Sequence, residues 1–82
     1  RRHILTRVFE MAEHYFRGAT AGGADAAVRH CAEAGRLASS VFAYETAARC
    51  YSQAIDVLPL VEPPDPKREA DLCIALAETH WK

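Results

Sequence analysis

The residues of this chain that could do chemistry are histidines and cysteines, and their spacing argues against a metal site. His30 and Cys31 are adjacent, so on a helix their side chains would point about 100° apart. The chain contains no Cys-x-x-Cys and no His-x-x-x-His pair, which are the spacings typical of metal-binding segments. We therefore expect no bound metal or cofactor, and we interpret His14, His30, Cys31 and His80 as ordinary helix residues.

Other catalytic patterns are also missing from the sequence. Cys31 as a nucleophile would need a neighbouring base and a set of oxyanion donors, and the sequence suggests neither. The glycine-containing stretch Ala21-Gly22-Gly23 has no Gly-Lys-Ser/Thr and no preceding strand, so it does not resemble a phosphate-binding loop. Ten Lys and Arg residues are scattered among eleven Asp and Glu residues, for a net charge of −1. That balance predicts no nucleic-acid surface and no recognition helix, and we predict that the chain is not an enzyme.

The three cysteines, Cys31, Cys50 and Cys73, are an odd number without paired spacing. Each is surrounded by alanine and leucine in a helical pattern, so we interpret all three as buried thiols in a reducing cytoplasm. No apolar run approaches the roughly 18 residues of a membrane-spanning helix, and no signal-peptide pattern is visible at the start. These features predict a cytoplasmic location without a membrane contact.

We expect these side chains to lie on helices. Alanine is the commonest residue and β-branched residues are few, a composition that favours helices over strands. The apolar periodicity predicts four helices with short loops, over about residues 4–16, 24–38, 42–58 and 66–81. In the third of these, apolar residues lie on two sides, which is typical of a helix packed between two neighbours. The fold class predicted from the pattern is therefore all-α.

Local signals mark where these helices begin and end. Glu13 and Arg17 form a favourable i,i+4 pair near the end of the first helix, which we expect to stop at Gly18 and Ala21-Gly22-Gly23. The pair Ser39-Ser40 predicts a turn or an N-cap. Asp65 followed by Pro66 predicts the start of the fourth helix. That helix is expected to carry a broad apolar face, made of Ala70, Leu72, Cys73, Leu76, Ala77, His80 and Trp81.

Five residues carry a repeat pattern with gaps of twelve, four, three and five positions: Gly35, Ala47, Tyr51, Ala54 and Pro59. The pattern resembles the tetratricopeptide repeat, which has a small residue on its first helix, then Ala, an aromatic residue and Ala on its second helix, and a closing Pro. Small residues there let two helices approach closely, the aromatic residue fills the space between hairpins, and Pro ends the second helix.

In this register one unit covers roughly residues 28 to 61, and the fourth helix opens the next unit. Two positions depart from the repeat: Ala38 stands where a large aromatic residue is usual, and Cys31 where Trp is frequent. The second helix could instead pair with the first through Ala27, Cys31 and Ala34, so the sequence leaves the hairpin pairing open.

A wider pattern, from Ala12-Glu13-His14-Tyr15 through Ala34-Gly35-Arg36-Leu37-Ala38 and Tyr51-Ser52-Gln53-Ala54 to Trp81, is similar to the helical arrays of large bacterial signal-transduction ATPases. Those regulators often carry a LuxR-type helix-turn-helix or a nucleotide cyclase domain. The resemblance implies a fragment of an α-solenoid, and a non-catalytic protein-interaction or sensor segment of a multidomain, ATP-dependent transcriptional regulator. The alternative is a scaffold repeat of an adaptor or enzyme that has no regulatory role.

Repeat arrays bind partners in a groove lined by the first helices of successive units. In this chain those are the second and fourth helices, so the candidate groove residues are Arg29, Glu33, Arg36, Asp71 and Glu78. For each of them the simpler interpretation, and the one favoured by the residue type alone, is an ordinary solvated charge. The expected partner is another protein, or the neighbouring repeats and domains of the parent chain.

The ends of the chain suggest an excerpt. Residues 1–82 begin with Arg1-Arg2-His3, without an initiator Met, and stop at Trp81-Lys82 inside an apolar helical pattern. We therefore expect a single tetratricopeptide-like segment of a larger protein. Its two end helices carry more apolar residues than one face can bury, so we expect the fragment to self-associate through an end helix as a symmetric dimer.

Overall fold

The computed structural model describes residues 2–18 and 23–81, and in this part of the chain it contains four α-helices and no strand. The predicted all-α fold is confirmed. The helices and one 3₁₀ turn follow in the order α1 (Arg2–Arg17), α2 (Ala24–Ser40), α3 (Tyr44–Val57), η1 (Leu58–Leu60) and α4 (Pro66–His80). The expected stop of the first helix at residues 21–23 lies largely outside the described residues, and α1 ends directly before Gly18.

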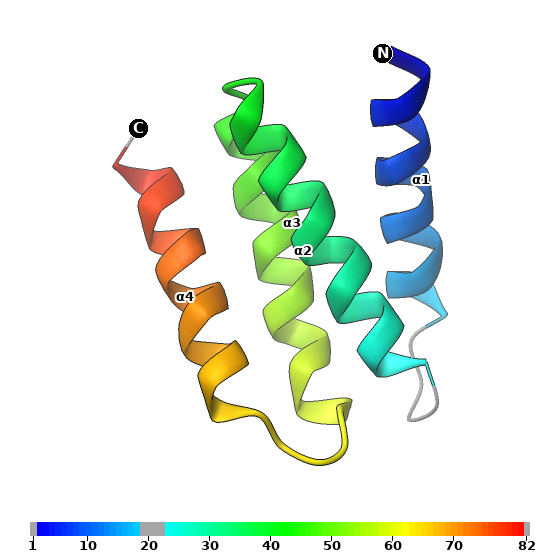
Figure 1. Ribbon diagram of the computed structural model, residues 1–82, viewed down its shortest axis with the longest axis vertical. Coiled ribbons are helices and arrows are strands. Elements are labelled where there is room, and N and C mark those ends of the chain that lie inside the picture. The colour runs from blue at the N-terminus through cyan, green and yellow to red at the C-terminus, as the bar shows by residue number, and fades with distance from the viewer. Residues whose placement is uncertain (1, 19–22, 82) are drawn as a thin grey trace.

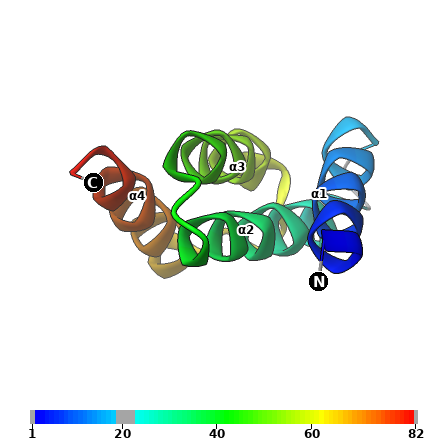
Figure 2. The same cartoon turned by 90° about the horizontal axis from the view of Figure 1, so that it is seen from above.

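The four helices form an open, flat array. Successive helices run antiparallel, and α1 and α4 lie at opposite ends of the array in both views (Figures 1 and 2). The Cα atoms extend over 33 × 27 × 14 Å, which is a slab about one to two helices thick. α3 packs against both α2 and α4, so the predicted position of the third helix between two neighbours is confirmed.

The pairing that the sequence left open is resolved by the extent of the contacts. α2 packs most extensively against α3 and next against α1. α2 and α3 therefore form the hairpin with the most extensive packing among the described residues. α1 lies beside α2 at the end of the array away from α4, and it also contacts α3 (Figure 2).

Small side chains dominate the core between these helices. The buried residues of α2 are Ala24, Ala27, Val28, Cys31, Ala34, Gly35 and Ala38, and those of α3 are Ala47, Cys50, Tyr51, Ala54 and Val57. Helices that face each other with alanine and glycine can approach to the short end of the usual interaxial range. Tyr51 is the one aromatic residue of this core among the described residues, and it is 6% exposed.

α2 and α3 approach each other closely at Gly35. A Cβ atom on Gly35 would lie 2.7 Å from Cε1 and 2.8 Å from Cζ of Tyr51, well inside van der Waals contact. Ala47 and Ala54 flank Tyr51 on α3, and both are fully buried. Pro59 is exposed in η1, two residues after α3 has ended. It therefore helps to turn the chain away from α3 and adds nothing to the core between α2 and α3.

The connection between α2 and α3 differs from the predicted one. Ser39 and Ser40 remain inside α2, and Ala43 precedes α3 without a side-chain cap. The turn is instead made by backbone hydrogen bonds, from the Phe42 N–H to the Ser39 carbonyl at 3.0 Å and from the Ala43 N–H to the Ala38 carbonyl at 2.8 Å. This is a Schellman motif, and it delays the start of the third helix from the expected residue 42 to Tyr44.

The start of α4 follows the prediction, and only part of its apolar face is buried. The Asp65 carboxylate accepts a hydrogen bond from the Arg68 N–H at 3.1 Å, directly before Pro66. α4 packs mainly against α3 and therefore buries only a narrow stripe, made of Leu72 and Thr79 with Ala75 and Leu76 partly covered. The rest of the broad apolar face expected for this helix is exposed: Ala70, Cys73, Ala77, His80 and Trp81.

Candidate functional site: a groove between α2 and α4

Two hollows lie between α2 and α4. The first, of about 550 Å³, is lined by Arg29, His30, Ala32, Glu33, Arg36, Arg68, Asp71 and Leu72. The second, of about 440 Å³, is lined by Arg36, Ser39, Ser40, Tyr44, Tyr51, Ala75, Glu78 and Thr79. Arg36 lines both, so we treat them as one surface and call it the α2–α4 groove.

All five polar residues selected from the sequence line this groove. Arg29, Glu33, Arg36 and Asp71 line the first hollow, and Arg36 and Glu78 line the second. The structure brings them together because α2 and α4 run in the same direction, with α3 between them at the back (Figures 1 and 2). Tyr51 of α3 contributes to the second hollow.

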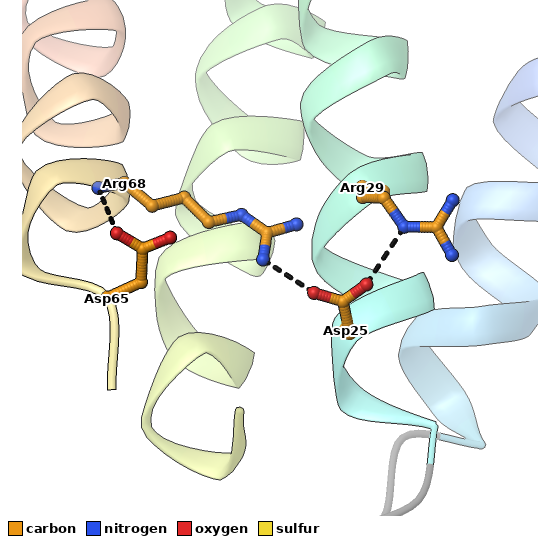
Figure 3. A network of polar contacts seen from close by, with 4 residues as sticks. All are labelled: Asp25, Arg29, Asp65 and Arg68. Atoms are coloured by element: carbon orange, nitrogen blue, oxygen red, sulfur yellow. Dashed lines mark hydrogen bonds and ion pairs between the residues drawn. The ribbon is translucent and has the colours of Figure 1, made fainter. Parts of the chain in front are cut away.

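An ion-pair bridge joins α4 to α2 where both helices begin. Arg68 donates from Nη1 to Oδ1 of Asp25 at 2.7 Å, and Arg29 donates from Nε to Oδ2 of the same carboxylate at 3.0 Å (Figure 3). The Arg68 side chain is only 23% exposed. Sequence reasoning missed this bridge, because Asp25 and Arg68 are 43 positions apart and no local pattern links them.

The bridge makes the pKa of Asp25 sensitive to both arginines. Hydrogen bonding from Arg68, and then from Arg29, lowers the pKa of the Asp25 carboxyl below its usual value. A depressed pKa in the folded state stabilises the fold above the unfolded-state pKa of about 3.9, and this stabilisation is lost as the pH falls through the folded-state value. Because the carboxylate is largely exposed, the contribution is modest.

We expect Asp25→Asn to lower the free energy of unfolding by at most about 1 kcal/mol at neutral pH, since solvent screens the pairs. The difference between the variant and the parent should shrink as the pH falls from about 4, the unfolded-state pKa, through the lower folded-state pKa of Asp25. Urea unfolding between pH 3 and 7 measures both. A difference that persists unchanged at the lowest pH would show that the ion pairs do not stabilise the fold.

The remaining charges of the groove leave groups free for a ligand. Arg36 donates from Nη2 to Glu33, and this engages one of the five N–H donors of a guanidinium. Among the described residues, Asp71 and Glu78 take part in no ion pair. The groove therefore offers both cationic donors and carboxylate acceptors, which suits recognition of a polypeptide with polar side chains.

Hydroxyl groups gather in the second hollow, and the sequence did not single them out as a group: Ser39, Ser40, Tyr44, Tyr51 and Thr79. The hydroxyls of Ser40 and Thr79 donate to carbonyl groups of their own helices, those of Leu37 at 2.7 Å and Leu76 at 2.6 Å. Their oxygen lone pairs remain able to accept hydrogen bonds. Ser39 and Ser40 were interpreted as a turn signal, and only the continuation of α2 places them on a groove wall.

The residues first considered for chemistry do not form a site in the part of the chain that the structure describes. The ring of His30 stacks on Tyr15 of α1, with centroids 4.4 Å apart and an interplanar angle of 2°. The Cys31 thiol donates to the Ala12 carbonyl at 3.8 Å. Among the described residues, no three His, Cys, Asp or Glu side chains are grouped as metal ligands would be. Likewise, none of the described helices has the length and apolar character needed to cross a membrane.

The cysteines differ in exposure, which corrects the expectation of three buried thiols. Cys31 and Cys50 are buried, whereas Cys73 is exposed because α4 has no neighbour on its outer face. Burial raises the pKa of the Cys31 thiol to about 11 and also raises that of Cys50. Since the thiolate is the reactive form, these two thiols should be nearly inert in the folded chain.

We therefore expect a thiol reagent such as 5,5′-dithiobis(2-nitrobenzoate) to modify one cysteine rapidly at neutral pH. Mass spectrometry of the digested product should assign that cysteine as Cys73. Cys31 and Cys50 should react only after urea is added. Rapid modification of either buried thiol without urea would contradict the packing of α1 and α3 against α2.

In comparisons with known proteins, no family model, no curated protein and no solved structure matches this chain. The fold and the site define an open all-α array with a polar groove.

Proposed function

We propose that this chain is a non-catalytic protein-interaction or sensor segment, built like tetratricopeptide repeats, and that it belongs to a multidomain, ATP-dependent signalling or transcriptional regulator. The α2–α4 groove is the surface that binds the partner. The ATPase module of such a regulator would lie elsewhere in the parent chain. Its natural setting in this proposal is the cytoplasm.

One observation carries the proposal. A repeat register based on Gly35 and Tyr51 selects α2 and α4 as the helices of a binding face, and the five polar residues chosen on that basis line one groove. The contact between Gly35 and Tyr51 supports the same register, since a close approach at this position is what the repeat requires. The polar lining of the α2–α4 groove supports a polypeptide ligand over an apolar small molecule.

Binding in the groove can be tested with displayed peptides. Random peptides are selected against the folded chain, and calorimetry measures the affinity of one selected peptide for the parent and the variants. We expect Arg36→Ala and Glu78→Ala each to weaken binding about tenfold, or about 1.4 kcal/mol. Lys67→Ala, an exposed cation of α4 outside the groove, should leave binding unchanged.

Loss of affinity with Lys67→Ala alone, or equal affinity for all variants, would contradict the groove as the binding surface. The regulatory setting has a separate test, the sequence that surrounds this segment in its gene. A Gly-Lys-Ser/Thr phosphate-binding loop upstream would support the regulator. Further repeats alone would favour the second candidate, a scaffold repeat without a regulatory role.

The outer face of α4 supports a second contact, between two copies of the chain. Exposed apolar residues recur there at helical spacing: Ala70, Cys73, Ile74, Ala77 and Trp81. Ile74 is 58% and Trp81 86% exposed. Small and large residues alternate along this stripe, so an antiparallel pair related by a two-fold axis would set Trp81 against Ala70 and Ile74 against Ala77 of the second copy.

We therefore expect the isolated chain to form a symmetric dimer through α4. Sedimentation velocity should show an association that depends on concentration, and the emission of Trp81 should shift to the red on dilution. Ile74→Glu should give a folded monomer, because it places two carboxylates inside the contact. A parent chain that stays monomeric at high micromolar concentration would rule out this dimer.

A further inference from the structure

A buried tyrosine opens its hydroxyl into the second hollow of the α2–α4 groove. Tyr51 is 6% exposed and lines that hollow. Its hydroxyl takes part in no hydrogen bond with another described residue. Among the described residues, no fully covered side-chain nitrogen or oxygen lacks a partner, so the Tyr51 hydroxyl is accessible to solvent. The small exposed part of this side chain therefore includes the hydroxyl group.

The position of the Tyr51 ring is fixed by α2. A Cβ atom on Gly35 would lie 2.7 Å from Cε1 and 2.8 Å from Cζ, the carbon that carries the hydroxyl. The ring thus packs directly against α2, at a residue that has no side chain. A hydroxyl that is already held in place loses little conformational freedom on binding, so its hydrogen bond to a ligand contributes more to the affinity. The fold therefore places a fixed hydrogen-bonding group at the floor of the hollow without using that group itself.

The other polar groups of the second hollow supply both donors and acceptors. The hydroxyls of Ser40 and Thr79 already donate to carbonyls of their own helices, so they can only accept from a ligand. Arg36 keeps N–H donors beyond the one that binds Glu33. Glu78 takes part in no ion pair among the described residues, and its carboxylate accepts hydrogen bonds. A ligand group that both donates and accepts would satisfy this lining.

Two properties of the second hollow favour a neutral polar group. The hollow is lined by one cation, Arg36, and one carboxylate, Glu78, so a charged group of either sign meets a like charge, which is unfavourable at an interface. An apolar group would cover the Tyr51 hydroxyl without offering it a hydrogen bond, and a covered polar group without a partner weakens binding. The carboxamides of glutamine and asparagine are neutral, and they combine two N–H donors with an accepting oxygen.

We propose that the second hollow is a subsite for a side-chain carboxamide, which a glutamine or asparagine of the partner polypeptide provides. The Tyr51 hydroxyl donates to the carboxamide oxygen, and the Glu78 carboxylate with the Ser40 and Thr79 hydroxyl oxygens accepts from the amide N–H groups. This subsite rests on the proposed function, because it requires a polypeptide in the α2–α4 groove. It adds to the groove a preference for one kind of side chain.

Selection of displayed peptides on two forms of the chain tests the subsite. The parent and Tyr51→Phe are each used to select from the same random library. We expect the parent to enrich glutamine or asparagine at one position, and Tyr51→Phe to lose that enrichment. Tyr15→Phe, which removes a phenol hydroxyl from α1 outside the groove, should keep it. Tyr51→Phe should melt like the parent, since it removes only a hydroxyl that the fold does not use.

Calorimetry with one peptide selected by the parent gives the size of the effect. Tyr51→Phe should weaken binding about tenfold. Replacing the carboxamide residue of the peptide by methionine, which is similar in size but forms only weak hydrogen bonds, should weaken it to a similar extent. The two changes together should cost little more than either one alone, because each removes the same hydrogen bond. Glutamate or lysine at that peptide position should bind no better than methionine.

The outcomes separate this inference from the proposed function. The carboxamide subsite would be overturned, with the groove kept as the binding surface, by peptides whose binding Arg36→Ala weakens and Tyr51→Phe does not. A charged or apolar side chain enriched in place of the carboxamide would have the same meaning. Failure to select any peptide that depends on the groove would overturn both proposals. A lower melting temperature for Tyr51→Phe than for the parent would show that the hydroxyl serves the fold, and it would also overturn the subsite.

Discussion

Replacing Gly35 with leucine is expected to destabilise the fold by about 1–3 kcal/mol or more, because the new side chain must occupy space that the Tyr51 ring fills. A Cβ alone would lie 2.7 Å from Cε1 of Tyr51, and leucine adds three further carbons. A chain of this length is expected to have only about 4–12 kcal/mol of stability in total. The loss should be visible in thermal and urea unfolding.

Matched variants separate overpacking from helix propensity. Gly35→Ala adds a methyl group against Tyr51, whereas Gly18→Ala adds one that meets only the His14 carbonyl, at 3.5 Å. The first should be destabilising and the second close to neutral. Combining Gly35→Leu with Tyr51→Ala should cost less than the sum of the single changes, since the alanine leaves room for the leucine.

A Gly35→Leu variant that melts like the parent, or at a higher temperature, would contradict the repeat register. An exposed glycine inside a helix gains about 1 kcal/mol of helix propensity on replacement. Only a close contact between α2 and α3 reverses that sign.

Leu72→Ala is expected to cost about 2–5 kcal/mol and to release α4 from the array. Leu72 is the one large buried side chain of α4 among the described residues, at 6% exposure, and α4 packs mainly against α3. Hydrogen exchange should show loss of amide protection in α4 first, with α2 and α3 still protected. Peptide binding in the α2–α4 groove should be lost with it, because α4 forms one wall.

The control is Ile74→Ala, two residues further along the same helix. Ile74 is 58% exposed, so at a concentration at which the chain is monomeric its truncation should change the free energy of unfolding by no more than about 0.5 kcal/mol. Similar losses for both variants would show that α4 is rotated about its axis, and this would remove Asp71 and Glu78 from the groove.

The elements of this fold were accessible from the sequence because their signals are local. Asp65 and Pro66 start α4 where expected, and Glu13 and Arg17 pair in α1 at 2.8 Å. Gly35 and Tyr51 could be matched because both lie in one repeat pattern. Which face of α4 is buried was not accessible, since that helix carries apolar residues on two sides and only the position of α3 selects the stripe around Leu72.

Other features required the folded chain because they join distant or atypical residues. Arg68 reaches Asp25 across the groove, and no spacing rule connects them. Phe42 adopts a backbone conformation that its residue type disfavours. The residue preferences for turns therefore predicted the turn at Ser39 and Ser40 and not at Phe42. The exposure of Cys73 depends on α4 having no outer neighbour, which the sequence around that cysteine does not reveal.

The central claim is that the α2–α4 groove is the binding surface, and amide chemical shifts test it most directly. ¹⁵N-labelled chain is titrated with a peptide selected against the parent, and the perturbed amides are mapped onto the fold. The account predicts that they cluster at Arg29, Glu33 and Arg36 on α2 and at Asp71 and Glu78 on α4. Perturbations confined to α1, or to the outer face of α4 around Ile74 and Trp81, would contradict it.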